Sequence, residues 1–266
     1  MLRNMFRLSK HIKLKNREAV LNIKLVIEYD GSKYFGWQRQ SNKPTIQQTI
    51  EESLQVFFKG EKIKLTGAGR TDTGVHALGQ AANFKISREK YVKYGKERLL
   101  RSINAILAKD IAITNLNIVD NDFHSRYSAI SRNYRYYMTF RKPAFDADKQ
   151  CFVKTKFDID LAKDFCKLLI GKHSFRSLCK NREDEHNYFC HVYNAKLRKL
   201  INGRAVFEIT ANRFLHSMVR AIAGTMIKIA SGKLSITEFK YKFKKGETLK
   251  IQYAPSNALV LHKINY

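Results

Sequence analysis

The stretch GAGRTDTGVHALGQ, residues 67–80, carries four glycines beside an arginine, an aspartate and a histidine. Glycines at this density indicate a backbone that bends sharply or that another group approaches closely. The flanking segments 62–67 and 80–86 have the composition of strands, so we predict a loop between two strands. Phosphate cradles of nucleotide-binding proteins lead into a helix instead, and their glycine spacing differs. The stretch therefore excludes a nucleotide cradle and leaves a catalytic loop or a tight turn.

Hydrophobic spacing in the rest of the chain predicts an α+β fold. Period-two alternation predicts strands at 21–29, 132–140 and 258–264, and an Asn-Gly pair at 202–203 predicts a hairpin. Helical spacing is found at 45–58, 97–108, 160–171 and 216–232. The first of these helices begins with a capping box formed by Thr45 and Gln48. We expect sheet and helices in two similarly sized halves, 21–130 and 131–266.

The charge of the chain points to a polyanionic partner. The 266 residues include 50 Lys and Arg against 23 Asp and Glu, which gives a formal net charge of +27. An imbalance of this size opposes compaction by self-repulsion, and nucleic acid is the first partner that it suggests. A lysine-rich proteome in which every protein drifts basic is the alternative explanation. The 44% hydrophobic content is enough to build a core.

The compartment is less clearly indicated. No apolar run approaches the roughly 20 residues of a membrane span, so we expect a soluble protein without a membrane partner. Four widely spaced cysteines suggest reduced thiols in the cytoplasm. The basic extension 1–20 has three interpretations: an RNA-binding arm, an organellar transit peptide, or an upstream start codon ahead of Met5.

Asp72 is the first candidate for chemistry, because it lies between Arg70 and His76 in the glycine-bounded loop. A carboxylate near a guanidinium stays ionised, and an ionised aspartate serves as nucleophile or general base without a metal. The alternative is an aspartate that caps a turn through its own backbone hydrogen bonds.

Two other segments interleave aromatic and basic side chains. Residues 29–40, YDGSKYFGWQRQ, offer Tyr34 and Trp37 for stacking on bases and Lys33 and Arg39 for phosphates. Residues 123–138, FHSRYSAISRNYRYYM, contribute the side chains Arg126, Arg132 and Tyr134. Either segment could line a basic groove, and in either segment the aromatic rings could equally pack into the core.

A buried cation and a possible metal site complete the candidates. Arg220 lies one position off the apolar stripe of the helix at 216–232, and a near-buried arginine needs an anionic partner, for which Asp72 is the obvious choice. The cluster formed by Cys179, His186, Cys190 and His191 suggests zinc, but its spacing matches no structural zinc pattern. We therefore expect no metal.

Taken together, these segments resemble the tRNA pseudouridine synthase A family. GRTDTGVHA, at 69–77, is the most specific signature. Four other segments occur in the family's order: YDGSKYFGWQRQ before the signature, and FHSRYSAISRNYRYY, FLHSMVRAIAGTMI and APSNALVL after it. The resemblance therefore runs from about Leu21 to the C-terminus. It implies the pseudouridine synthase fold, with a mixed, mainly antiparallel sheet flanked by helices.

The resemblance also implies an activity. The family isomerises uridines of the tRNA anticodon stem-loop, typically at positions 38 to 40, by breaking the N1–C1′ bond and rejoining the base through C5. Asp72 would be the catalytic carboxylate, Tyr134 would lie against the base, Arg220 would orient Asp72, and Arg70 would hold the nucleotide out of its stack. His76 would belong to the RNA-binding set. A homodimer that binds tRNA at the stem-loop and elbow, without metal or organic cofactor, is expected.

The chain departs from the family pattern at three places. Ser256 and Asn257 stand where the family often has Pro or a small residue and Gly. Arg213 stands where Gly is common, and we predict that it contacts RNA. The charged segment 178–188 matches poorly. A non-catalytic RNA-binding relative and a metal-dependent nuclease are the competing functions, and the absence of acids next to Asp72 in the sequence argues against the nuclease.

Overall fold

The structure is a computed structural model and describes residues 20–180, 187–247 and 249–266. The basic extension 1–20 therefore lies outside the described residues except for Val20. The helices are α2 (Ile46–Phe57), α3 (Arg88–Tyr94), α4 (Lys96–Ile106), α5 (Ile159–Leu169), α6 (Met218–Ala230) and α7 (Ile236–Lys245). The strands are β1 (Val20–Tyr29), β2 (Thr66–Gly67), β3 (His76–Ser87), β4 (Ile111–Val119), β5 (Ser131–Thr139), β6 (Cys151–Phe152), β7 (Gly171–Ser174), β8 (Phe189–Leu200), β9 (Arg204–Ala211) and β10 (Leu259–Asn265).

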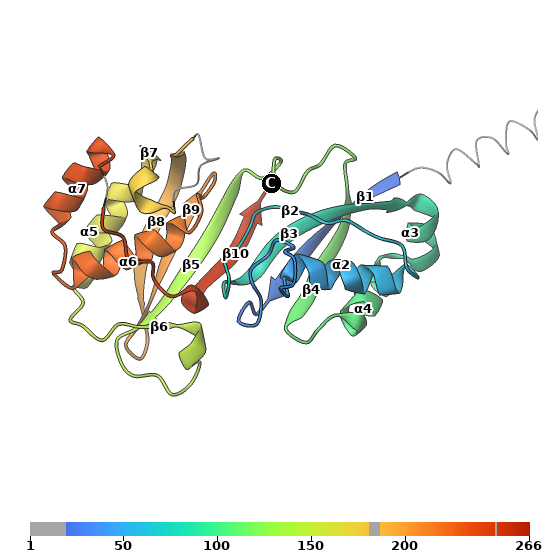
Figure 1. The fold of residues 1–266 in the computed structure, drawn as a ribbon, viewed down its shortest axis with the longest axis horizontal. Coiled ribbons are helices and arrows are strands. Elements are labelled where there is room, and N and C mark those ends of the chain that lie inside the picture. Colours follow the sequence, from blue (N-terminus) through green and yellow to red (C-terminus); the bar gives the residue numbers. More distant parts are fainter. Residues whose placement is uncertain (1–19, 181–186, 248) are drawn as a thin grey trace, which may run out of the picture.

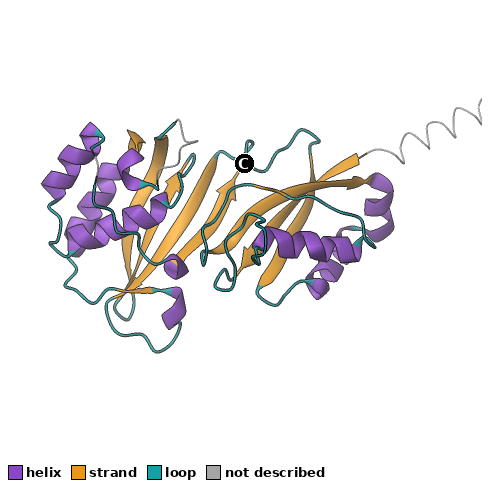
Figure 2. Ribbon diagram, viewed as in Figure 1, coloured by secondary structure: helices purple, strands orange, loops and turns teal. Residues whose placement is uncertain are grey.

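The strands form one mixed, mainly antiparallel sheet, which confirms the predicted α+β class. Its order is β4-β1-β3-β10-β5-β9-β8-β7, with β2 paired to β3 and β6 paired to β5. The β10–β3 and β5–β6 pairs are parallel. Figure 1 shows α2, α3 and α4 beside the strands of the N-terminal half and α5, α6 and α7 beside those of the C-terminal half. Figure 2 shows the same separation by element type.

The last strand of the chain lies in the middle of this sheet. β10 is antiparallel to β5 along most of its length, and it meets β3 at Val260–His76 and Leu261–Ala77. Because β3 belongs to the first half of the chain and β5 to the second, β10 completes the sheet between them (Figure 1). One hydrophobic core continues across both halves.

Local sequence signals account for several element boundaries. The Thr45 hydroxyl accepts a hydrogen bond from the Gln48 amide and so caps α2, but the Gln48 side chain bonds to Glu52, so only half of the predicted capping box forms. Asn202 and Gly203 adopt positive φ angles of 60° and 65° in the turn between β8 and β9, as the hairpin prediction requires.

The strand predicted at 62–67 is wrong in its length, since only β2 is regular. Residues 61–65 run without a ladder, although Ile63 and Leu65 are buried. Side chains of α2 replace the missing strand: Leu65 donates its amide to Glu51 and accepts at its carbonyl from Gln47. Amphipathic alternation alone could not distinguish this arrangement from a strand. Within the described ranges, each helix is too short or too polar to span a membrane.

The central position of β10 predicts that its buried side chains control folding. Leu261→Ala removes a side chain that is 1% exposed at the junction of the halves, and we expect a loss of about 2–5 kcal/mol in the free energy of unfolding. Lys263→Ala, on an exposed position of the same strand, is the matched control. Urea unfolding measures both, and equal midpoints would contradict the central role of β10.

Candidate active site

Residues 68–75, here called the Asp72 loop, connect β2 to β3 and are held by the aromatic loop that follows β1. The Thr71 carbonyl accepts from the Trp37 amide at 3.2 Å, and the Gly74 amide donates to the Tyr34 carbonyl at 3.3 Å. The two loops therefore lie backbone against backbone, which fixes the path of the catalytic candidate's main chain.

Glycines make this close approach possible. Gly36 has a φ of 86°, and a Cβ atom there would lie 2.4 Å from the Thr71 carbonyl oxygen. A Cβ atom on Gly31 would lie 2.0 Å from the Val75 carbonyl oxygen. Because real Cβ atoms do not approach oxygen so closely, only glycine fits at these two positions of the aromatic loop.

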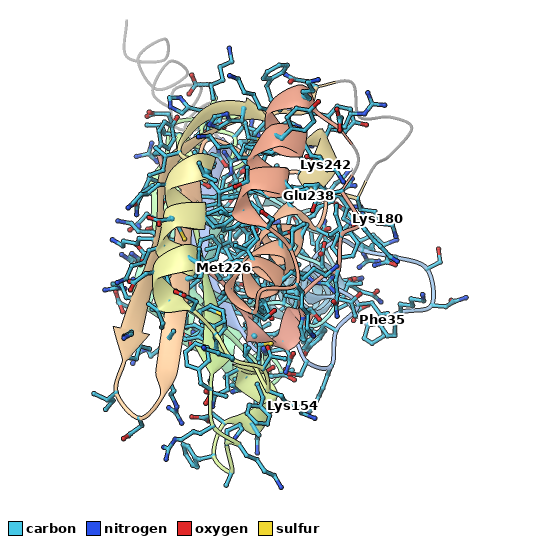
Figure 3. All side chains as sticks on the ribbon, turned by 90° about the vertical axis from the view of Figure 1, so that its left-hand side faces the viewer. Phe35, Lys154, Lys180, Met226, Glu238 and Lys242 are labelled. Carbon is cyan, nitrogen blue, oxygen red and sulfur yellow. The ribbon has the colours of Figure 1, made fainter. Side chains whose placement is uncertain are left out.

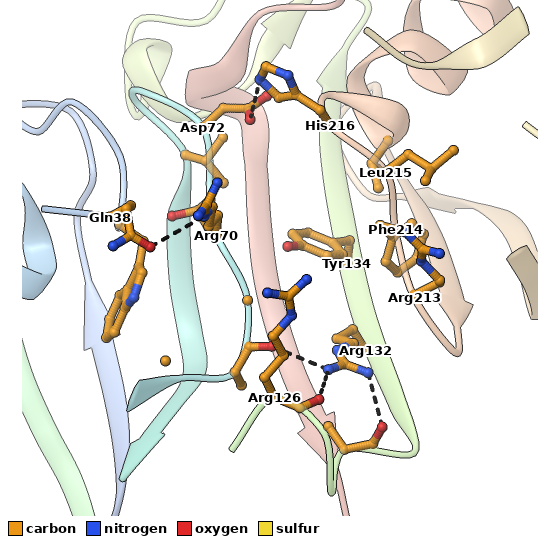
Figure 4. A pocket seen from close by; sticks show the side chains of 18 of the residues that line it. Gln38, Arg70, Asp72, Arg126, Arg132, Tyr134, Arg213, Phe214, Leu215 and His216 are labelled. Atoms are coloured by element: carbon orange, nitrogen blue, oxygen red, sulfur yellow. Dashed lines mark hydrogen bonds and ion pairs between the residues drawn. The ribbon is translucent and has the colours of Figure 1, made fainter. Parts of the chain in front are cut away.

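The Asp72 carboxylate is held by three residues around the start of α6. Its Oδ2 atom accepts from the Ser217 hydroxyl at 2.7 Å and from Nη1 of Arg220 at 3.2 Å. Nε2 of His216 lies 3.7 Å from the other oxygen, Oδ1 (Figure 4). The predicted pairing of Asp72 with Arg220 is thus present in the structure. It joins residues far apart in the sequence and leaves Oδ1 as the oxygen with fewer contacts.

Arg220 is itself anchored on its other side. Nε donates to the Ala254 carbonyl at 3.0 Å, and the Ala254 amide donates back to the Arg220 carbonyl at 3.0 Å. The guanidinium also lies 6.0 Å from the ring centroid of Tyr253. With one edge bonded to the backbone, the guanidinium has a fixed direction in which to present Nη1 to Asp72.

These groups lie in a cleft of about 970 Å³ between the two halves of the sheet. Figure 4 shows Asp72 and His216 at one end, Tyr134 in the middle, and Arg126 and Arg132 at the other end. Asp72 is the sole acid among the described residues that line the cleft. The cations that line it are Lys64, Arg70, Arg126, Arg132, Arg213 and Arg220. The cleft is therefore strongly positive around one carboxylate.

Tyr134 lies in the middle of this cleft, on the central strand β5. It is 9% exposed, and its ring meets Phe214 edge to face at a centroid distance of 5.1 Å. Burial is the main cause that raises the pKa of its hydroxyl, with the charges of Tyr29 and Asp72 adding to the shift. The side chain therefore stays neutral and forms part of the cleft lining.

Three of the predicted RNA contacts line the cleft with side chains directed to its surface. Nε of Arg70 donates to the Gln38 side chain at 3.2 Å, Arg126 lies over the Tyr127 ring, and Nη1 of Arg213 donates to the carbonyl of Asn187. Their role in RNA binding stays a prediction, and the geometry is compatible with it.

Arg132 also lines the cleft, but its side chain is engaged with the protein. Its guanidinium donates to four backbone carbonyls, those of Ala129, Asn212, Ala68 and Arg126. Burial is the main cause that lowers the pKa of this side chain. These four bonds tie the wall of the cleft together, and contact of Arg132 with RNA stays a prediction.

The stacking role predicted for Tyr34 and Trp37 stays a prediction. Their side chains are 7% and 2% exposed, so both rings pack mainly within the protein, and Trp37 also borders the cleft. The Tyr34 hydroxyl donates to Asp110 at 2.6 Å, and burial together with this bond raises its pKa. Of this loop's rings, Phe35 is the exposed one, at 41%, on a projecting segment (Figure 3). The burial of both rings therefore favours the core-packing alternative for Tyr34 and Trp37.

Three further predicted contacts do not line the cleft. His76 is 6% exposed, accepts from the Gly31 amide at Nδ1, and bonds through Nε2 to the Asn257 carbonyl, so it joins three segments of the core. Arg39 pairs with Glu51 at 3.1 Å. Lys33 is exposed and lies 4.0 Å from Asp110. RNA contact by His76, Lys33 and Arg39 stays a prediction, and the burial of His76 favours a structural role for that residue.

The cluster considered for zinc is only partly described. His186 lies outside the described residues, and within them no group of three or more His, Cys, Asp or Glu side chains could hold a metal ion. Cys179 and Cys190 are buried, and His191 is exposed.

Sequence reasoning missed two groups next to the carboxylate, His216 and Ser217. Ser217 adopts a φ of 55°, which an L-residue rarely takes, and this conformation directs its hydroxyl to Asp72. Both residues directly precede α6 in the segment FLHSMVR, so their nearness to Arg220 was the available signal. The structure thus places a single carboxylate, held by arginine and serine, in a cationic cleft, an arrangement typical of an enzyme that acts on a polyanion.

Comparisons with known proteins agree with this class. The family model described as tRNA pseudouridine synthase matches residues 25–128 and 165–266. The tRNA pseudouridine synthase A of Caldicellulosiruptor bescii is 40% identical over 86% of this chain and 94% of its own length. That of Thermodesulfovibrio yellowstonii is 37% identical over 93% of this chain and 100% of its own. The chain therefore belongs to the tRNA pseudouridine synthase family, whose members are isomerases acting on uridines of tRNA.

The contact between the two loops predicts that replacing Gly36 lowers the stability of the protein. Gly36→Ala places a methyl group against the Thr71 carbonyl at a positive φ, and we expect it to destabilise the protein by at least about 1–2 kcal/mol. Gly69→Ala is the control, because a Cβ atom there meets nothing within 4 Å. Thermal unfolding distinguishes the two, and a Gly36→Ala protein as stable as the control would contradict the packing described.

Proposed function

We propose that this protein converts uridine to pseudouridine in the anticodon stem-loop of tRNA, at positions 38 to 40, with Asp72 as the catalytic carboxylate. The observation that carries the proposal is the placement of Asp72 as the one acid among the described lining residues of a cationic cleft, clamped by Arg220 and Ser217. An isomerisation without net hydrolysis requires no more than one well-placed carboxylate, which either attacks sugar or base or removes a proton.

The roles of the other groups follow from their positions. Tyr134 offers the flat surface against which a target base would lie, and Arg220 orients Asp72. A uridine within a stem is unreachable unless it leaves its stack, so a pocket and a side chain to fill the vacated space are needed. Arg70, exposed and on the same loop as Asp72, is placed to hold the displaced nucleotide.

The remaining parts of the proposal concern partners and compartment. A cleft lined by six cations suits a backbone-directed contact with tRNA phosphates, as does the net charge of +27. We further propose a homodimer that contacts both the stem-loop and the elbow of the tRNA. Its location would be cytoplasmic, or organellar if residues 1–20 are a transit peptide.

Replacing the carboxylate by its isosteric amide tests the central claim. Asp72→Asn should lower pseudouridine formation by on the order of 10⁴-fold or more, because the amide neither attacks nor accepts a proton. Binding of the tRNA should persist, since the phosphate contacts are retained. The measurement maps pseudouridine by position in an unmodified tRNA transcript, with binding followed separately.

The outcomes separate the competing functions. An active Asp72→Asn protein would refute the catalytic role. A wild-type protein that binds tRNA but forms no pseudouridine would be an RNA-binding relative without catalysis. Pseudouridine outside positions 38 to 40 would keep the chemistry and change the substrate site.

The hydrogen bond from Ser217 predicts a separate effect on rate. Ser217→Ala removes the donor to Oδ2, and we expect kcat to fall by about 10-fold with KM nearly unchanged, since one hydrogen bond to a charged group is lost. Ser217→Gly should lower kcat similarly but be about 1 kcal/mol more stable than Ser217→Ala, because glycine accepts a φ of 55° without strain. Steady-state kinetics and thermal unfolding of both variants test this. Unchanged kcat in Ser217→Ala would refute a positioning role.

A further inference from the structure

Two large apolar side chains are exposed on the wall of the cleft. Tyr127 is 76% exposed and Ile130 is 62% exposed, and both line the same cleft as Asp72. Single exposed apolar residues are ordinary on protein surfaces. A pair of them within one cationic cleft is different, because both line the surface that a ligand in the cleft would face.

The segment that carries Tyr127 is held in a compact turn. Nδ1 of His124 accepts from the amides of Arg126 and Tyr127, at 3.1 Å and 3.3 Å. The Ser128 amide donates to the His124 carbonyl at 2.9 Å, and the Ser128 hydroxyl accepts from the His124 amide at 3.1 Å. The backbone that presents the Tyr127 ring is therefore fixed, so binding a ligand there would cost little ordering entropy.

This turn is also tied to the Asp72 loop. Arg132 donates to the Arg126 carbonyl at 2.7 Å and to the Ala68 carbonyl at 3.2 Å. Ala68 opens the Asp72 loop, so one guanidinium bridges the two walls of the cleft. Figure 4 shows Arg126 and Arg132 at the end of the cleft away from Asp72, with Tyr134 between the two ends. Arg126 therefore lies beyond the expected target position, and Tyr127 is its neighbour in the chain, with its ring under the Arg126 guanidinium.

The surroundings of the Tyr127 ring suit a nucleobase. The imidazole of His124 packs on it with ring centroids 4.4 Å apart, and the Arg126 guanidinium lies 5.6 Å from its centroid. Tyr127 keeps 76% exposure despite these contacts, so most of its side chain remains accessible to a ligand. Aromatic side chains beside cations bind unpaired bases by stacking while the cation meets the phosphate.

We propose that Tyr127 is a stacking platform for an unpaired base of the RNA substrate next to the target uridine, with Ile130 bordering it. This inference rests on the proposed function, since it assumes an RNA in the cleft. An RNA partner is favoured over a protein by charge: the described lining residues include one acid and six cations. The stacking surface thus lies in the cleft wall opposite the aromatic loop, whose Tyr34 and Trp37 are buried.

Equilibrium binding of two RNA probes tests the platform. One probe is the anticodon stem-loop hairpin, which offers unpaired bases, and the other is a duplex of the same number of nucleotides. Tyr127→Ala should weaken hairpin binding by about 5- to 150-fold and leave duplex binding unchanged. Tyr127→Phe should bind both probes like the wild type, since it keeps the ring. Tyr241→Ala, which removes a tyrosine that is 55% exposed on α7 and outside the cleft lining, is the matched control.

Salt dependence separates stacking from charge. Tyr127→Ala should keep the slope of log Kd against log salt, whereas Arg126→Ala should weaken both probes and reduce that slope by about 1. Unchanged hairpin affinity in Tyr127→Ala, equal losses for hairpin and duplex, or a change of oligomeric state with RNA affinity intact would overturn the proposal. Because binding is measured without turnover, failure here is distinguishable from the absence of pseudouridine that would refute the proposed function.

Discussion

The pairing of β10 with both β3 and β5 is the constraint on which the site depends. Asp72 belongs to the first half of the chain, and Ser217 and Arg220 belong to the second. Their contacts of 2.7 Å and 3.2 Å require the two halves to be held at a fixed distance. A strand inserted between the halves supplies that distance, because ladder hydrogen bonds leave no freedom of separation. The final strand of the chain is therefore also the part that assembles the carboxylate clamp.

The segment leading into β10 extends this role to the side chains. Ala254 exchanges hydrogen bonds with Arg220, and a Cβ atom on Gly224 would collide with the Gln252 carbonyl, so the segment lies directly on α6. Farther on, the Asn257 carbonyl bonds to His76, and the Ser256 hydroxyl would lie 2.8 Å from a Cβ atom on Gly74. Residues 252–257 thus touch both the helix that carries Arg220 and the loop that carries Asp72. Ser256 and Asn257, which differ from the family pattern, therefore lie in the segment that contacts both of these elements.

The sequence predicted well what depends on local pattern. The Asn202–Gly203 turn, the start of α2 and the mixed class of the fold all follow from residues that are neighbours along the chain. The Asp72–Arg220 pair was also anticipated, because a near-buried arginine needs an anionic partner and Asp72 was the obvious candidate. In contrast, periodicity carries no information about sheet order, so the central place of β10 could not be read from ALVLHKI.

Aromatic residues mark the limit of such prediction. The segment that contains Tyr34 and Trp37 has the aromatic and basic composition of an RNA-stacking loop, yet both rings are buried. Whether a ring faces the core or the solvent depends on what the fold places against it. Here the glycines of the aromatic loop allow that loop to pack closely on the Asp72 loop. Ser217 escaped notice for a related reason, since its φ of 55° follows from tertiary packing and not from its residue type.

The buried rings of the aromatic loop also contribute to the cleft itself. Trp37 lines the floor of the cleft and fills the space over Gly67, where a Cβ atom would lie 2.3 Å from the indole nitrogen. The Trp37 ring packs against the residue before the Asp72 loop and so restricts inward movement of that loop, which carries Asp72 and Arg70. The basic and aromatic side chains of the site are therefore divided: buried rings support the Asp72 loop, and exposed side chains line the cleft.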